Sequence, residues 1–164
     1  MKTSIITLFC VFAIIACTNS QKNSENISEA QTKEAQTVAQ NFLDNLAKND
    51  TTAIFATFSS KAIYSMGGEF KKMADLIQIA RSANSGILKQ TFENVTDHYL
   101  FLNSNIFIYD YKCLNKMYEK SGVVTTIDPV CCSYTFQKDQ EGWKIVHMHE
   151  TWMNVTVDSS MVKK

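Results

Sequence analysis

Two histidines near the end of the chain have the residue type and spacing to do chemistry. His147 and His149 are separated by one residue in GWKIVHMHETW, residues 142–152. On a β-strand, side chains two residues apart lie on the same face. The pair can therefore share a metal ion, act as a general acid and base, or supply polar contacts to a binding site.

A metal site needs more ligands than this pair supplies. Zinc is held by at least three protein ligands, and His98 is the only other histidine of the chain. The chain has no CxxC or Cys/His zinc spacing, and the residues around the two histidines are aromatic more than acidic. We therefore expect neither a metal nor another cofactor.

The strand that carries the histidines is expected to pair with the strand before it. Residues 130–138 and 143–155 have strand patterns, and a polar turn joins them. Unbroken pairing from this turn places Tyr134 opposite His147 and Cys132 opposite His149, and it leaves Glu150 on the other face. The face with the histidines is the richer in aromatic residues, so we expect both histidines to point inward.

Hydrophobic spacing places three helices in the first half of the chain. Apolar residues recur at helical intervals over residues 35–46, and Ser28 opens a capping box upstream. Thr52 is a candidate cap for a second short helix that carries Phe55 and Phe58. A third helix is expected from residue 73 to near residues 84–86.

The rest of the domain has the pattern of β-strands. A brief strand is expected over residues 62–65, and longer strands over residues 90–102 and 106–114 lead to the final hairpin. Helices followed by a meander of strands indicate an α+β fold, with helices packed on one face of an antiparallel sheet.

Composition excludes some classes of protein. Hydrophobic residues make up 45% of the 164 residues, enough for a buried core and too many for a disordered chain. The 16 basic and 16 acidic residues balance. Nucleic-acid binding is not expected, because it calls for clustered positive charge.

The first residues are typical of a secretory signal peptide. Lys2 precedes an apolar run over residues 5–16, which is too short to span a bilayer. The run ends in Ile-Ile-Ala-Cys, which resembles the bacterial lipobox. The resemblance implies cleavage after Ala16, lipid attachment to Cys17, and anchoring in the bacterial cell envelope, on the periplasmic or outer-membrane face.

These signals divide the chain into four parts. Residues 1–16 are the expected signal peptide, and the polar residues 17–34 are the expected flexible tether. The domain is expected over residues 35–157, with a tail at residues 158–164.

Three cysteines remain in the domain after lipidation. Cys113, Cys131 and Cys132 are an odd number, so they cannot all pair within one chain. We expect buried, reduced thiols.

Three features of the chain resemble the NTF2-like superfamily and, within it, the SnoaL-like branch. They are AQNFLDNLAKNDTTAIFATFS at residues 39–59, a glycine after the first strand, and GWKIVHMHET at residues 142–151. Many members of the branch have a serine where this chain has Thr151. The resemblance covers about residues 35–155. It implies a cone in which a curved antiparallel sheet wraps around N-terminal helices, a pocket at the wide end, and frequent homodimers through the sheet.

The superfamily includes isomerases, dehydratases, cyclases, carriers and assembly domains, so the fold does not define the function. Members of the isomerase branch resemble one another in a tyrosine on the first helix and a basic aspartate after the first strand. This chain has Phe42 and Met66 at those places. The donor and the proton acceptor of that chemistry are both missing, which argues against isomerase activity.

Two functions remain open. The favoured one is a lipid-anchored domain that binds a small apolar or aromatic molecule, or a protein partner, in or through the cone. The alternative is a SnoaL-like enzyme of the cyclase, dehydratase or isomerase type, with His147 or His149 as general acid or base; Asp110, the candidate partner of such a histidine, is expected to point outward. The residues expected to line the pocket are Phe42, Tyr64, Tyr109, Tyr111, Cys132, Tyr134, His147 and His149.

The anchor can be tested with one substitution. Cys17→Ser removes the thiol that would carry the lipid, so the mature chain should leave the detergent phase or remain unprocessed. Detergent partitioning and the intact mass of both proteins measure this. Identical partitioning and identical mature mass of the wild type and the variant would refute the lipobox interpretation.

Overall fold

The computed structural model describes residues 27–160 and 162. The expected signal peptide, the lipidation site Cys17 and the tether up to residue 26 lie outside the described residues. Three helices precede or interrupt the sheet: α2 (Glu29–Ala47), α3 (Thr51–Ala56) and α4 (Met73–Asn84). None of the helices in the described part of the chain is long and apolar enough to cross a membrane.

Six strands form one curved sheet in the order β2-β1-β6-β5-β4-β3. All neighbouring strands are antiparallel except β1 and β6, which are parallel. The strands are β1 (Phe58–Met66), β2 (Glu69–Lys72), β3 (Ile87–Asn103), β4 (Ile106–Glu119), β5 (Val124–Asp139) and β6 (Gly142–Asp158).

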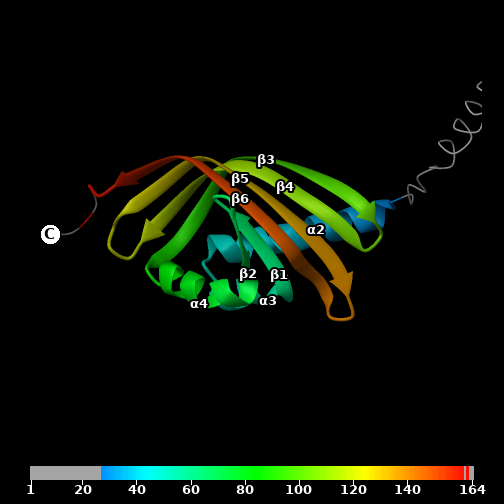
Figure 1. Cartoon of the computed structure of the whole chain (residues 1–164). Helices are drawn as coiled ribbons and strands as arrows, with labels where there is room; N and C mark the ends of the chain where they lie inside the picture. The colour runs from blue at the N-terminus through cyan, green and yellow to red at the C-terminus, as the bar shows by residue number, and fades with distance from the viewer. Residues whose placement is uncertain (1–26, 161, 163–164) are drawn as a thin grey trace, which may run out of the picture.

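The helices lie on the concave side of this sheet (Figure 1). The long strands β3 to β6 arch over α2, while α3 and α4 lie below the short strands β1 and β2 (Figure 1). The expected α+β architecture, a curved sheet wrapped around N-terminal helices, is therefore confirmed. An arched sheet with helices under one end leaves space between the two layers, and that space holds the candidate site.

Helix α2 begins earlier than the expected domain boundary at residue 35. Ser28 and Gln31 form the capping box, with the Gln31 N–H donating to Ser28 Oγ at 3.2 Å. Residues 29–34 of the expected tether are therefore helical. Glu34 fastens this first part of the helix to the sheet, because its Oε1 accepts hydrogen bonds from Lys138 Nζ at 2.7 Å and from Trp143 Nε1 at 2.9 Å. These two hydrogen bonds lower the pKa of Glu34.

The second helix begins and ends earlier than expected and has a different cap. Asp50, not Thr52, caps α3, because its carboxylate accepts a hydrogen bond from the Ala53 N–H at 3.0 Å. Phe58 does not belong to this helix. It is the first residue of β1, and it packs against Phe42 of α2 with the ring centroids 5.9 Å apart.

Aromatic residues fill the space between α2 and the sheet. Phe42 is 2% exposed and makes edge-to-face contacts with Phe58, Tyr134 and Phe136. On the sheet, Phe107 stacks on Phe136 at 4.7 Å. Edge-to-face and offset pairs of this kind add to the free energy gained by burying the rings. Phe42 is thus the contact that holds the longest helix to β1 and β5.

The pairing of β5 with β6 contains a bulge. Phe136 lies opposite Ile145, but Thr135 lies opposite His147, so Val146 is an extra residue on β6. Side chains alternate along a strand, and one extra residue moves every later side chain to the other face. The expected pairing of Tyr134 with His147 and of Cys132 with His149 is therefore wrong. Tyr134 lies opposite Met148.

The role of Phe42 in the core is measurable. Phe42→Ala should lower the free energy of unfolding by about 3–5 kcal/mol, because it leaves a cavity among three rings. Phe70→Ala is the matched control: Phe70 is 75% exposed, so its loss should change stability by no more than about 0.5 kcal/mol. Denaturant unfolding of both variants measures the difference, and equal effects would show that α2 is not held through Phe42.

Candidate functional site

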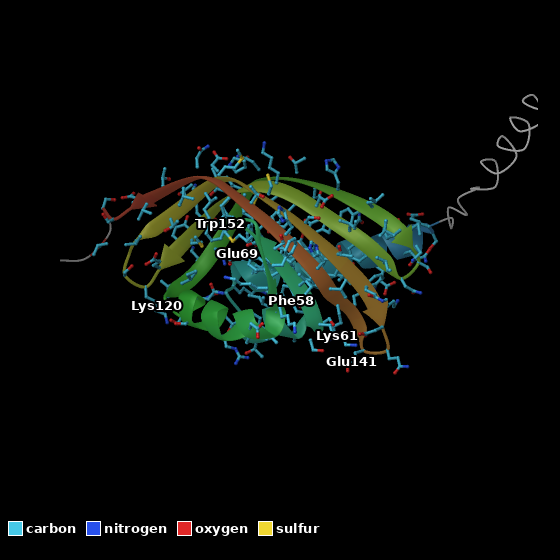
Figure 2. The ribbon with its side chains drawn as sticks, in the orientation of Figure 1. Phe58, Lys61, Glu69, Lys120, Glu141 and Trp152 are labelled. Carbon is cyan, nitrogen blue, oxygen red and sulfur yellow. The ribbon has the colours of Figure 1, made fainter. Side chains whose placement is uncertain are left out.

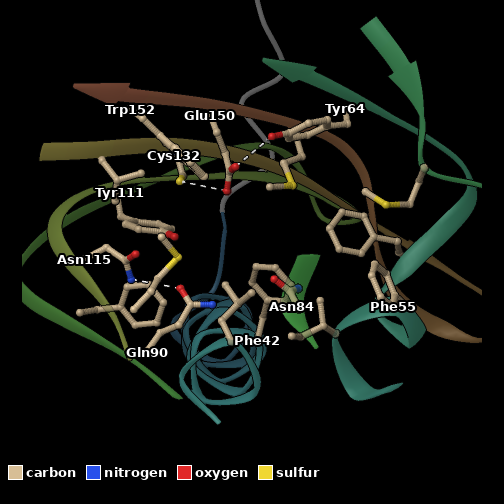
Figure 3. Close-up of a pocket in the computed structure, with 18 residues that line it drawn as sticks. Phe42, Phe55, Tyr64, Asn84, Gln90, Tyr111, Asn115, Cys132, Glu150 and Trp152 are labelled. Carbon is tan, nitrogen blue, oxygen red and sulfur yellow. Dashed lines mark hydrogen bonds between the residues drawn. The ribbon is translucent and has the colours of Figure 1, made fainter. Parts of the chain in front are cut away.

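A cavity of about 410 Å³ lies between the concave face of the sheet and the helices. Its floor is formed by apolar side chains of α2, α3 and α4, among them Phe42 and Phe55, and its roof by strands β4, β5 and β6 (Figure 3). Trp152, which is 43% exposed, lies at one end of the roof. The walls are mostly apolar, as in most sites for small molecules.

One carboxyl group points into the cavity from the roof. Glu150 Oε2 accepts a hydrogen bond from Tyr64 Oη at 3.1 Å, and Oε1 accepts from Tyr134 Oη at 3.4 Å. The Cys132 thiol lies 3.7 Å from the same Oε1 (Figure 3). Three strands thus bring their polar atoms to one point: β1 with Tyr64, β5 with Cys132 and Tyr134, and β6 with Glu150.

Burial makes ionisation of this carboxyl less favourable. The apolar surroundings raise the pKa of Glu150 above its usual value of 4.5, and the hydrogen bonds from Tyr64, Cys132 and Tyr134 offset only part of that rise. Among the described residues that line the cavity, Glu150 is the only charged one. None of the ion pairs within the described residues includes it.

The neighbouring hydroxyl and thiol groups remain protonated. Burial raises the pKa values of Tyr64, Tyr111 and Tyr134 above that of an exposed tyrosine. Burial and the nearby Glu150 carboxylate also raise the pKa of the Cys132 thiol. A thiol with a raised pKa is a poor nucleophile at neutral pH. Cys132 is therefore a hydrogen-bond donor of the site and not a nucleophile.

A second, neutral polar group lies across the cavity. Asn115 of β4 is 4% exposed, and its Nδ2 donates to Gln90 Oε1 of β3 at 3.2 Å (Figure 3). Asn84, the last residue of α4, lines the same side. The cavity therefore has an acidic end at Glu150 and an amide end at Asn115, with aromatic side chains between them.

Four of the residues expected to line the pocket do so: Phe42, Tyr64, Tyr111 and Cys132. Two others lie in the core next to it. Tyr109 is 1% exposed and packs against Tyr99 and Tyr111 at centroid distances of 4.9 and 5.5 Å. Tyr134 reaches the site only through its hydroxyl group.

The two histidines do not line the cavity, and this expectation is wrong. His147 lies opposite Thr135 and His149 opposite Ser133, on the face of the sheet turned away from the helices. His149 is exposed, and its ring nitrogens lie 3.2 Å from Ser65 Oγ and 3.2 Å from Thr151 Oγ1. The bulge at Val146 is the cause. Among the described residues, no group of three or more His, Cys, Asp or Glu side chains could hold a metal ion.

The expectation from sequence missed Met148, Glu150 and Trp152 as lining residues. The sequence contains a pattern that could have indicated these three residues. If β6 alternated without interruption, Val146, Met148 and Trp152 would share the outer face, which would leave three large apolar side chains in solvent. An extra residue before Met148 removes that conflict, because it turns Met148 and Trp152 toward the core.

The fold has known relatives among solved structures. A hexachlorocyclohexane dehydrochlorinase (LinA), type 2, matches with a TM-score of 0.64 and 10% identity, over 84% of this chain and 97% of that one. An NTF2-like protein from Rhodospirillum rubrum matches with a TM-score of 0.60 and 10% identity, over 73% of this chain and 98% of that one.

An assembly domain has the same fold. The association domain of C. elegans CaMKII matches with a TM-score of 0.57 and 20% identity, over 74% of this chain and 95% of that one. No protein-family model and no curated protein matches the chain. Identities this low show the fold alone. The chain has the NTF2-like fold.

The raised pKa of Glu150 predicts a dependence of stability on pH. The unfolded chain releases the Glu150 proton near pH 4.5, while the folded chain holds it to a higher pH. Between these two pKa values the folded state binds more protons, so the free energy of unfolding falls as the pH rises. The glutamine side chain does not titrate, so Glu150→Gln does not lose stability in this way. Its free energy of unfolding, relative to that of wild type, should therefore rise by up to about 1.4 kcal/mol per pH unit in that window.

Glu141→Gln is the control for this titration. Glu141 lies at the tip of the β5–β6 hairpin, far from Trp152 and the cavity (Figure 2). Its substitution should leave the pH dependence of wild type unchanged. Denaturant unfolding between pH 4 and pH 8 measures all three proteins. A stability difference between Glu150→Gln and wild type that is constant with pH would contradict the burial of the carboxyl.

Proposed function

We propose that the chain is a lipid-anchored protein of the cell envelope that binds a small apolar or aromatic molecule in its cavity. The observation that carries this proposal is a cavity of about 410 Å³ with mostly apolar walls, in which Glu150 is the single charged residue among the described lining residues. Sites for small molecules combine apolar walls with a few convergent polar groups. The polar groups here are the carboxyl of Glu150 and the hydroxyls of Tyr64 and Tyr111.

The anchor part of the proposal rests on the N-terminal sequence. An apolar run that ends in Ile-Ile-Ala-Cys supports lipid attachment to Cys17. The polar residues that follow would act as a spacer between the lipid and Ser28, where helix α2 is capped. A ligand-binding domain would then be held close to the membrane surface.

General acid–base catalysis is a second candidate, with Glu150 as the reacting group. The histidines are no longer candidates, because they lie on the outer face of β6. A buried carboxyl with a raised pKa can donate or accept a proton, and Tyr64 and Tyr134 would stabilise charge beside it. A mass change in a molecule released from the cavity would distinguish catalysis from binding.

A homodimer through the sheet is part of the same proposal. Leu100 and Leu102 of β3 are 56% and 58% exposed, so β3 presents apolar area to a partner. Apolar area of this kind is typical of contact surfaces. The cavity opens on the other side of the sheet, so this dimer would leave it accessible.

Filling the cavity tests the binding proposal. Met148→Trp places a larger side chain in the roof of the cavity, so it should weaken binding of the uncharged probe 2-(1-naphthyl)ethanol by at least about tenfold. His147→Trp is the matched control, because it changes the adjacent residue on the outer face. Probe fluorescence and native mass spectrometry of the purified chain measure the bound fraction.

The two variants also show where binding takes place. Weaker binding in Met148→Trp with unchanged binding in His147→Trp supports the cavity. Weaker binding in His147→Trp alone would move the site to the outer face of the sheet. If the wild-type chain binds no probe and copurifies with no small molecule, the proposed function is wrong.

A further inference from the structure

The Glu150 carboxyl lies in a cavity whose described lining residues carry no positive charge. Apart from Glu150, those residues have apolar, aromatic, amide or thiol side chains, and none of them is a lysine, arginine or histidine. The three groups that contact the carboxyl are neutral donors, on Tyr64, Tyr134 and Cys132. Buried charges in proteins are normally paired. The described lining residues supply no cation to pair with this carboxyl.

The carboxyl also has an open acceptor position. Each carboxylate oxygen has two lone pairs that can accept hydrogen bonds. Oε1 is contacted by both Tyr134 and Cys132, while Oε2 is contacted by Tyr64 alone. Oε2 therefore keeps one position for a donor that enters the cavity, and Glu150 is itself one of the lining residues (Figure 3).

Aromatic rings line the cavity that holds this oxygen. Tyr64, Tyr111, Phe92 and Trp152 line the cavity from four different strands, and Phe92 and Tyr111 meet edge to face at 6.4 Å. The face of an aromatic ring attracts a cation, and several rings around one carboxylate are a recurrent way to bind ammonium groups. An anionic ligand would meet the opposite conditions, since it would face a carboxyl and the electron-rich faces of these rings.

We propose that the cavity selects apolar or aromatic molecules that carry a protonated amine, and that the ammonium group pairs with Glu150. This inference rests on the proposed function, because it names the chemical class of the molecule bound at the same site. The ammonium donates to Glu150 Oε2, and the apolar part of the ligand occupies the space toward Phe42, Phe55 and the amide end. A charge-assisted hydrogen bond in apolar surroundings is stronger than the neutral bond an alcohol would make.

Pairing with an ammonium requires the ionised carboxylate. The groups that face Glu150 are Tyr64 from β1, Cys132 and Tyr134 from β5, and Tyr111 from β4; His149 is adjacent on β6 but points to the outer face. The hydroxyl and thiol groups in this group stay protonated, so Glu150 is the group that can release a proton. Since burial raises its pKa, binding of an ammonium at a pH where Glu150 still holds its proton should release that proton. A neutral ligand should release none.

Three probes of one shape test the inference on the full-length chain. They are 2-(1-naphthyl)ethylamine, 2-(1-naphthyl)ethanol and 1-naphthylacetate, which are cationic, neutral and anionic at pH 7. The amine should bind at least about tenfold more tightly than the alcohol, and the acetate should bind more weakly than both. Calorimetry in two buffers with different ionisation enthalpies measures affinity and proton release together.

The Glu150→Gln variant distinguishes recognition of the ligand's charge from recognition of its shape. It should reduce amine binding to the level of the alcohol and abolish proton release, while alcohol binding stays within about threefold of wild type, which shows that the cavity is intact. Glu141→Gln, with a side chain 79% exposed at the hairpin tip, should keep the wild-type preference.

Each outcome decides between the two proposals. Equal binding of amine and alcohol by wild type overturns the amine inference and leaves cavity binding standing. An amine preference that survives in Glu150→Gln also overturns it. Failure of all three probes to bind wild type overturns the proposed function together with the inference. The comparison of probes on wild type needs no variant, so it remains decisive even if Glu150→Gln does not fold.

Discussion

The pairing of β5 with β6 has one residue more on β6, and the chemistry of the cavity depends on where that residue falls. Val146 is the extra residue, between Ile145 opposite Phe136 and His147 opposite Thr135. Ile145 is fully buried in the core, so the turn-proximal part of β6 faces inward at the odd-numbered residues. After Val146 the even-numbered residues face inward. Glu150 therefore points into the cavity, and His147 and His149 point to the outer face of the sheet.

Glu150 points toward apolar side chains, and the groups around it reduce the cost of that placement. Ionisation of an acid among apolar side chains is unfavourable, and this cost raises the pKa of Glu150. Tyr64, Tyr134 and Cys132 provide donors that reduce this cost, but none of them provides charge. These residues adjoin the hydrophobic core, because Phe42 contacts Tyr134 directly. The site therefore adjoins the buried aromatic core, and its described lining residues supply no positive charge to pair with Glu150.

Much of the fold followed from the sequence because it depends on repeated patterns. Helical spacing and the capping box at Ser28 placed α2, and the strand patterns predicted a sheet that packs on the helices. Tyr111 and Cys132 of the cavity followed from the alternation of side chains along their strands. A bulge adds one residue without changing composition or hydrophobicity, so alternation alone places every residue beyond it on the wrong face. This is why Glu150 was expected in solvent and His149 in the cavity.

The position of the bulge can be measured directly in solution. Nuclear Overhauser effects between backbone protons of paired strands report which residues lie opposite each other across the β5–β6 hairpin. The structure predicts contacts that join Tyr134 to Met148 and Cys132 to Glu150. Contacts that join Tyr134 to His147 and Cys132 to His149 would contradict it. They would return the histidines to the cavity and remove Glu150 from it.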